Sequence, residues 1–245
     1  PRLRSAALVA VATLVLAACG VSAGGRQAPS GPMDAQQVLA ATRGSVAFIA
    51  TPYGTGSAIV IGPGLLVTNA HVVEPFDEVT VTTDDAGQDD LEGEVVGLDL
   101  AADVAVVQVD DLDAPALDLA DDTALPQGSD LYLVGFPGDQ DDHPEATISR
   151  GVLSRRRTSS VDDLRFLQTD ATIGHGQSGG ALVDDRGRVV GMSGLSDDDG
   201  FALALAAPDV AEAVDRIRAG EGDDWHPLPD PDHDRRRAAL EDGPT

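Results

Sequence analysis

The 245-residue chain has a formal net charge of −26, with 42 acidic side chains against 16 arginines and no lysine. This acidity argues against nucleic acid or anionic lipid as a partner, because both would repel the chain. Apolar residues make up 42% of the chain, enough for a hydrophobic core, and the single cysteine, Cys19, excludes an intrachain disulfide.

The N-terminal segment has the pattern of an export signal. Two arginines precede an apolar run over 6–16, which is too short for a comfortable transmembrane helix. The run leads into Leu-Ala-Ala-Cys, which resembles a bacterial lipobox. We therefore expect a signal peptide over 1–18, cleavage before Cys19 and a lipid anchor on Cys19. The alternative is an ordinary signal peptide cleaved after Ala23, and in either case the mature domain would lie outside the cytoplasm.

The central part of the chain has the pattern of an all-β protein. A tether rich in Gly, Ser and Pro over 19–32 leads to a short predicted helix over 33–43. Twelve short β-like runs follow, bounded by clusters of Gly, Pro and Asp. They lie near 45–50, 55–61, 65–68, 78–83, 92–97 and 104–109, and then near 130–135, 145–154, 164–169, 181–183, 188–194 and 201–206. Two groups of six predict two packed six-stranded antiparallel β-barrels, over 33–122 and 123–206.

The C-terminal region begins with a predicted helix over 207–219. Val210, Ala213, Val214 and Ile217 recur at helical spacing, and a glycine follows the run. We expect this helix to pack on the second barrel. The remaining segment, 220–245, is rich in proline and charge, which is typical of disorder.

Three residues form a candidate catalytic set. Ser178 lies in a glycine-flanked turn, His71 follows a β-like run, and Asp103 precedes another. A serine hydroxyl needs a base to become nucleophilic, and that base needs a third group to fix its tautomer. Taken singly, the three could be a turn serine, a packed histidine and one aspartate among many. Their joint occurrence in the order His, Asp, Ser favours nucleophilic catalysis.

The serine turn also offers a site for a developing negative charge. Attack on a carbonyl creates an oxyanion, which needs preset N–H donors. The N–H groups of Gly176 and Ser178 are close enough in sequence to point into one space. Glycine suits position 176 because such a turn commonly needs a positive φ.

Several segments resemble the bacterial trypsin-like proteases of the HtrA/Deg type. The segments are Gly54-Thr-Gly-Ser-Ala-Ile-Val-Ile61, Leu66-Val-Thr-Asn-Ala-His-Val-Val73, Ala102-Asp-Val-Ala-Val-Val107, Thr169-Asp-Ala-Thr-Ile173 with Gly176-Gln-Ser-Gly-Gly-Ala-Leu182, and Gly200-Phe-Ala-Leu203. The resemblance covers about Gly44 to Ala219. It implies a chymotrypsin-like fold and a serine endopeptidase that acts on peptides or unfolded proteins through an acyl-enzyme, without a cofactor or metal.

The resemblance assigns roles to particular residues. His71 would be the general base, Asp103 its orienting partner and Ser178 the nucleophile, with the N–H groups of Gly176 and Ser178 as the oxyanion hole. The residues expected at the substrate pocket are Thr172, Ser193, Gly194, Phe201 and Ala202. The chain departs from the family pattern at Gln177, where asparagine or aspartate is usual, and at His175.

Other readings of the same residues stay open. The chain could be a catalytically silent module that holds peptides in a protease fold, or a latent enzyme that needs an activating partner. After Ala219 the sequence has too few residues for a PDZ domain, so we expect a stand-alone protease domain. The acidic runs at 139–142 and 197–199 are interpreted as solvated turns rather than Ca²⁺ sites, because their spacing does not match an EF-hand.

Overall fold

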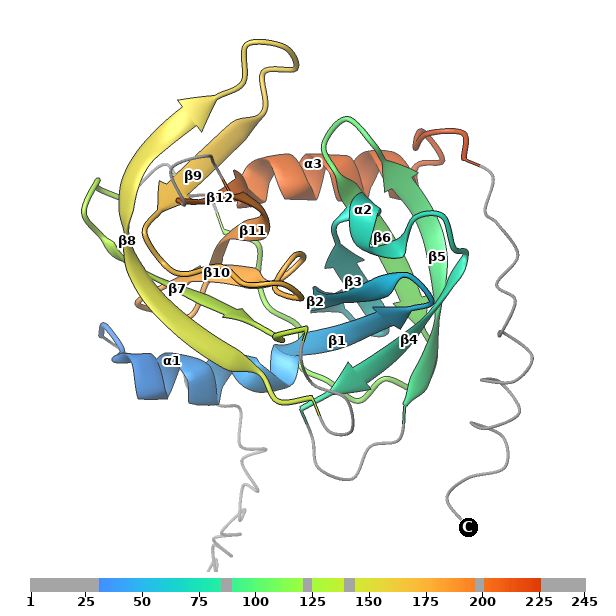
Figure 1. Ribbon diagram of the computed structural model, residues 1–245, viewed down its shortest axis with the longest axis horizontal. Coiled ribbons are helices and arrows are strands. Elements are labelled where there is room, and N and C mark those ends of the chain that lie inside the picture. Colours follow the sequence, from blue (N-terminus) through green and yellow to red (C-terminus); the bar gives the residue numbers. More distant parts are fainter. Residues whose placement is uncertain (1–30, 85–89, 121–124, 139–143, 197–200, 226–245) are drawn as a thin grey trace, which may run out of the picture.

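The computed structural model describes residues 31–225 except 85–89, 121–124, 139–143 and 197–200 (Figure 1). The predicted signal peptide over 1–18, Cys19, almost all of the tether and the tail beyond Trp225 lie outside the described residues. So do the acidic runs at 139–142 and 197–199. Within the described part, no helix is long and apolar enough to cross a membrane.

The first half of the chain forms a closed antiparallel barrel. Its strands are β1 (Val46–Thr51), β2 (Gly54–Gly62), β3 (Leu65–Thr68), β4 (Glu78–Thr83), β5 (Leu91–Asp99) and β6 (Val104–Val109). They follow one another around the barrel in the order β1-β2-β3-β6-β5-β4. The short helix α2 (Ala70–Val73) follows β3, and the 3₁₀ helix η1 (Arg43–Ser45) precedes β1.

The second half forms another closed antiparallel barrel. Its strands are β7 (Asp130–Gly135), β8 (Thr147–Thr158), β9 (Arg165–Thr169), β10 (Ala181–Asp184), β11 (Val189–Ser196) and β12 (Ala202–Ala206), arranged in the order β10-β11-β12-β9-β8-β7. The prediction of two six-stranded antiparallel barrels with a C-terminal helix is therefore confirmed. Strand β8 is longer than its sequence pattern suggested, because its arginine-rich end still pairs with β9 beyond a register shift at Leu153.

Burial explains why some strands alternate in polarity and others do not. In β4, Val79 and Val81 are buried while the neighbouring threonine Thr80 is only partly covered. Strand β6 is almost wholly apolar because both of its faces are buried. Val106 belongs to a core shared by the two barrels, whereas Val107 belongs to the interior of the first barrel.

The N-terminal helix α1 (Ala35–Thr42) lies against the second barrel, although it precedes the first in sequence. A capping box fixes its start, since Asp34 Oδ1 accepts a hydrogen bond from Gln37 N at 2.9 Å and Gln37 Oε1 accepts one from Asp34 N at 3.0 Å. The helix contacts β7 and β8, and Met33 N donates to Asp185 O at 2.6 Å. The chain thus crosses from the second barrel into the first at β1.

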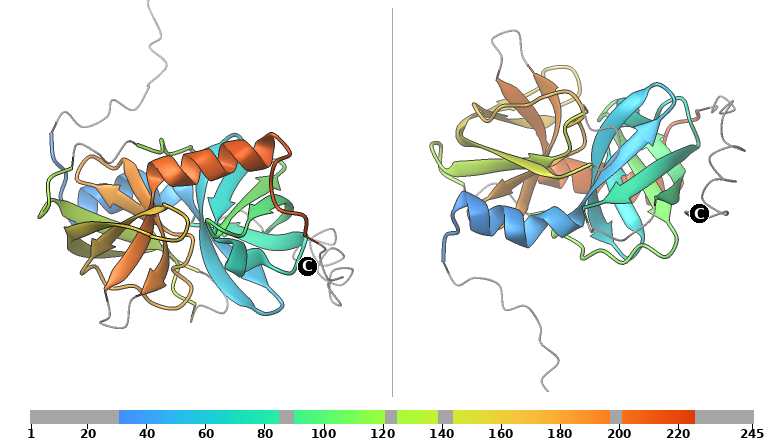
Figure 2. Two further views of the ribbon diagram at one scale, coloured as in Figure 1. Left: turned by 90° about the horizontal axis from the view of Figure 1, so that it is seen from above. Right: turned by 60° about the horizontal axis from the view of Figure 1, so that its bottom comes forward.

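The C-terminal helix α3 (Ala207–Arg218) lies across both barrels (Figure 2). It contacts β11 and β12 of the second barrel and β5 and β6 of the first. The helix thus packs on the second barrel, as the sequence predicted, and on the first barrel as well. Its apolar stripe is buried in the core shared by the barrels, so the helix covers their junction. The chain then folds back on the first barrel, whose core Trp225 contacts.

Candidate active site

Strand pairing brings His71 and Asp103 together. Strand β3 ends with Thr68 opposite Ala105, near the start of β6. The residues that follow β3 and the residues that precede β6 are therefore neighbours at one end of the first barrel. His71 lies in α2 just after β3, and Asp103 lies in the turn just before β6.

The carboxylate of Asp103 holds both the backbone and the ring of His71. Asp103 Oδ2 lies 2.7 Å from His71 Nδ1, and Asp103 Oδ1 accepts a hydrogen bond from His71 N at 3.0 Å. The pKa of His71 is raised above its ordinary value, mainly by the hydrogen bond with Asp103, and burial opposes that shift. With Nδ1 engaged by the carboxylate, a neutral ring would carry its free lone pair on Nε2.

Asp103 itself occupies an uncommon backbone conformation. Its φ is +54°, in the left-handed region that aspartate tolerates better than most residues do. The side chain of Asn69 donates from Nδ2 to Asp103 O at 3.0 Å, which ties the turn to the segment that carries His71. The orientation of the Asp103 carboxylate therefore depends on contacts that keep this turn in place.

The turn that carries Ser178 is anchored to the first barrel by Ser57, a fully buried residue of β2. Ser57 N donates to Ser178 O at 2.8 Å. The Ser57 hydroxyl donates to Gly176 O at 2.8 Å and accepts from Phe136 N at 2.8 Å. One side chain of the first barrel thus holds the serine turn and the end of β7 in the second barrel.

The N–H group of Gly176 is oriented by its neighbours. His175 O accepts a hydrogen bond from Gly138 N at 2.8 Å. In a trans peptide the C=O and N–H point in opposite directions, so the Gly176 N–H points away from Gly138. Gly176 has a φ of +84°, which glycine adopts without strain. No described residue accepts a hydrogen bond from the N–H of Gly176 or Ser178.

Gln177 closes the turn with neutral hydrogen bonds. Its backbone N donates to Gly174 O at 3.3 Å, and its side-chain Oε1 accepts from Gly174 N at 2.7 Å. Its Nε2 donates to Thr147 Oγ1 at 3.1 Å, which links the turn to β8. The Gln177 side chain is buried, and both its Oε1 and its Nε2 are hydrogen-bonded. The turn therefore accommodates glutamine at the position where the chain departs from the family pattern.

A cavity of about 440 Å³ connects these groups. The second barrel contributes Ile173, Gly174, His175, Gly176, Ser178 and Gly194 to its lining, and the first contributes Thr51, Tyr53, Gly54, Thr55, His71, Val72 and Glu74. His71 and Ser178 therefore face the same space from opposite barrels. Sequence reasoning did not find Tyr53 or Glu74, because a turn aromatic and a surface glutamate carry no motif.

The residues expected at the substrate pocket separate into two groups. Gly194 lines the cavity, while Thr172, Ser193, Phe201 and Ala202 are absent from its lining in the described part of the chain. Ser193 is buried behind the serine turn and donates to Gln177 O. Thr172 is exposed, and its carbonyl accepts a hydrogen bond from Ser149 Oγ at 2.7 Å. Within the same described residues, no cluster of three His, Cys, Asp or Glu side chains could bind a metal ion.

Comparisons with known proteins agree with this architecture. The chain is 37% identical over 162 residues to the putative serine protease HhoB of Synechocystis sp., a match that covers 63% of this chain and 38% of HhoB. It is 34% identical to a probable periplasmic serine endoprotease DegP-like of Pseudomonas savastanoi pv. phaseolicola, over 65% of this chain and 33% of that protein. The chain thus spans well under half the length of these two curated relatives.

A solved structure and a family model give the same result. The inactive form of a serine-to-alanine mutant of Rv3671c from M. tuberculosis H37Rv superposes with a TM-score of 0.65 at 29% identity, covering 81% of this chain and all of that one. The model of the trypsin-like peptidase domain matches residues 56–192, more than half of the chain, and this stretch contains His71, Asp103 and Ser178. The chain therefore belongs to the trypsin-like peptidase domain family.

Proposed function

We propose that the chain is a serine endopeptidase that hydrolyses peptide bonds in peptides or unfolded proteins. One observation carries the proposal: His71, whose ring is hydrogen-bonded to Asp103, and the hydroxyl-bearing Ser178 face one cavity, beside two N–H groups without a described acceptor. The names of the relatives, which are serine proteases, support the same reaction.

The proposed reaction follows from these positions. His71 Nε2 takes the hydroxyl proton as Ser178 Oγ attacks the substrate carbonyl. Asp103 holds the ring in the required tautomer and stabilises the imidazolium that forms. The N–H groups of Gly176 and Ser178 stabilise the oxyanion. The leaving amine then receives the proton from His71, and water hydrolyses the acyl-enzyme by the same route.

Labelling with a fluorophosphonate and cleavage of an unfolded protein test the proposal together. Wild type should react with the probe and cleave the substrate, whereas Ser178→Ala and His71→Ala should do neither at a comparable rate. Ser160→Ala is a matched control because Ser160 is an exposed serine in the β8–β9 turn, outside the cavity lining. A folded wild-type protein that neither labels nor cleaves would refute constitutive activity and favour the latent enzyme or peptide-binding module.

The proposed location is outside the cytoplasm, with a lipid anchor on Cys19. The N-terminal sequence pattern supports it, as does the periplasmic description of one relative. Replacing Cys19 with serine in the full chain should move the protein from the membrane fraction to the soluble fraction. Unchanged membrane association of Cys19→Ser would contradict the lipid anchor.

A further inference from the structure

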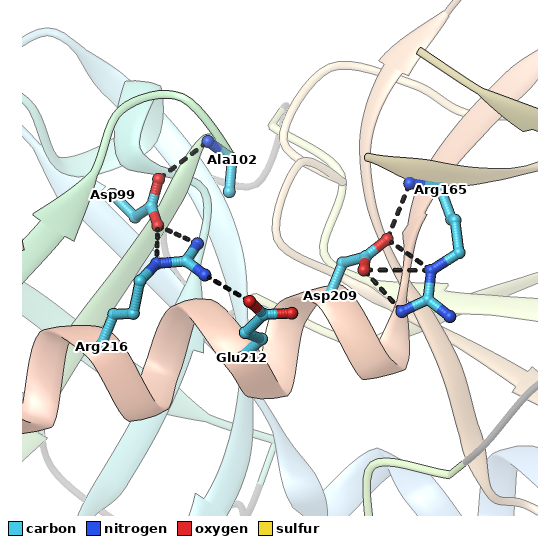
Figure 3. A network of polar contacts seen from close by, with 6 residues as sticks. All are labelled: Asp99, Ala102, Arg165, Asp209, Glu212 and Arg216. Carbon is cyan, nitrogen blue, oxygen red and sulfur yellow. Dashed lines mark hydrogen bonds and ion pairs between the residues drawn. The ribbon is translucent and has the colours of Figure 1, made fainter. Parts of the chain in front are cut away.

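Helix α3 is joined to each barrel by an ion pair (Figure 3). Near its start, Asp209 binds Arg165 of β9, with Arg165 Nη2 2.6 Å from Asp209 Oδ1. Near its end, Arg216 binds Asp99, the last residue of β5, through both Nε and Nη2. The two pairs have similar chemistry, but only the second contacts the first barrel.

Asp99 lies at the base of the turn that carries Asp103. Its Oδ1 accepts a hydrogen bond from Ala102 N at 2.9 Å, and its Oδ2 accepts one from Arg216 Nε at 3.0 Å. The residue is only 7% exposed. One buried carboxylate therefore bonds the backbone next to Asp103 with one oxygen and helix α3 with the other.

The segment after α3 holds the same turn from a second direction. Leu100 N donates to Asp223 Oδ2 at 2.6 Å, and Asp223 N donates to Leu98 O at 2.9 Å. Asp103 N donates back to Leu100 O, with a long distance of 3.4 Å. The backbone on both sides of Asp99 is thus bonded to the C-terminal part of the chain.

Removal of the arginine would leave the Asp99 carboxylate buried without its cation. A buried charge that loses its partner is costly, and it relaxes by moving toward water. That movement would break the bond to Ala102 N, one residue before Asp103. Because Asp103 already has a φ of +54°, its turn relies on neighbouring contacts for its conformation.

We propose that Arg216 and Asp99 are positioning residues that set the orientation of the catalytic aspartate, Asp103. This inference rests on the proposed peptidase function. Neither residue is part of the cavity lined by His71 and Ser178, so both act through the turn rather than on the substrate. The C-terminal helix then has a role in catalytic geometry besides covering the junction of the barrels.

The test compares Arg216→Met with Arg165→Met, which removes the other ion pair of the same helix. A misaligned catalytic group costs on the order of a hundredfold in rate. We expect Arg216→Met to lower kcat roughly 10- to 100-fold with little change in KM, and Arg165→Met to leave kcat unchanged. Asp99→Asn should reproduce the loss, and Arg216→Lys should recover part of it by retaining the charge.

The pH profile separates positioning from loss of stability. The hydrogen bond with Asp103 raises the pKa of His71, so a displaced Asp103 should lower that pKa. The acid limb of the kcat/KM profile should therefore move to lower pH in Arg216→Met and stay in place in Arg165→Met. A merely destabilised enzyme would lose amplitude without moving the limb. An unmoved limb and an unchanged kcat in Arg216→Met would overturn the inference, as would an equal effect of Arg165→Met.

Failure of the proposed function can be told apart from failure of this inference. If wild type has no activity beyond that of Ser178→Ala, the peptidase proposal fails. The NMR titration of the His71 ring still reports on Asp103 in that case. A lower pKa in Arg216→Met than in wild type and Arg165→Met would support the positioning role, and equal values in all three would overturn it.

Discussion

Replacing Ser57 with alanine removes one hydroxyl that bonds both the serine turn and the residue that follows β7. The Ser57 side chain is fully buried in β2 and bonds Gly176 O and Phe136 N, each at 2.8 Å. The backbone N–H of Ser57, which donates to Ser178 O, would remain. The variant therefore keeps the hydrogen bond to Ser178 O and loses the hydrogen bond to the carbonyl of Gly176, whose N–H is one of the two proposed oxyanion donors.

The expected loss of stability follows from the two groups left without a partner. An unsatisfied buried donor or acceptor costs about 1–3 kcal/mol. The carbonyl of Gly176 and the N–H of Phe136 together predict a lower free energy of unfolding by about 2–4 kcal/mol, if water partly replaces the hydroxyl. For a domain of this size, that corresponds to a fall in Tm on the order of 10 °C.

The expected loss of activity is separate from the loss of stability. Deleting one oxyanion donor outright costs on the order of 10²–10³ in kcat. In Ser57→Ala the Gly176 N–H remains, but the hydrogen bond from Ser57 to Gly176 O is lost. The hydrogen bond from Gly138 N to His175 O is kept and still orients the peptide that carries this N–H. We expect a fall in kcat/KM of roughly 10- to 100-fold, equivalent to about 1.4–2.7 kcal/mol of transition-state stabilisation.

Rates of fluorophosphonate labelling and peptide cleavage, measured well below Tm, check this expectation. Thr42→Val is a matched control because the buried Thr42 hydroxyl donates to Val38 O at 2.9 Å in α1, away from the cavity. The control should lower Tm without changing either rate. If Ser57→Ala lowers Tm and yet labels at the wild-type rate, the reasoning that Ser57 orders the oxyanion donors is wrong.

Two further predictions concern the same site. Gly179→Ala should abolish labelling and destabilise the fold, because a Cβ at this position would lie 2.0 Å from Ser57 O and the φ of Gly179 is +83°. The control is Gly44→Ala, which should behave as wild type because a Cβ there would meet no atom within 4 Å. A stable Gly179→Ala variant that still reacts with the probe would contradict the close packing. The raised pKa of His71 means that its pair with Asp103 stabilises the fold fully below about pH 6.5, and that this contribution is lost as pH rises through the higher folded-state value. The gap in unfolding free energy between wild type and His71→Ala, measured by denaturant titration, should thus narrow as the pH rises from below about 6.5 through the folded-state pKa of His71, and a gap that is constant or widens would exclude the linkage.

The sequence was sufficient for the parts of the fold that depend on local pattern. Twelve short apolar runs between turn residues predicted the twelve strands, because the faces of a strand that are buried determine which of its positions are apolar. Two motifs also marked His71 and Ser178 by their immediate neighbours. Asp103 was harder to single out among 42 acidic residues, and its place beside an apolar strand was the distinguishing signal.

Contacts between residues far apart in the sequence could not be predicted from local patterns. Ser57 and Gly176 are 119 positions apart, and Asp99 and Arg216 are 117 apart, so no local spacing predicts either bond. The docking of α1 on the second barrel and the extension of β8 depend on tertiary pairing in the same way. Gln177 was visible in sequence only as a departure from a family pattern, whereas its bonds to Gly174 and Thr147 explain how the turn accommodates it.

The placement of these distant bonds has a consequence for how the proposed site is assembled. His71 and Asp103 belong to the first barrel and Ser178 to the second, so neither barrel alone can align them. Ser57 fixes the serine turn directly against β2, and α3 bonds both barrels while it holds the turn before Asp103. Alignment of the nucleophile and alignment of the aspartate are therefore supported by different contacts. Ser57→Ala should impair oxyanion stabilisation without moving the acid limb of the pH profile, and Arg216→Met should move that limb, so the two variants probe separable halves of the site.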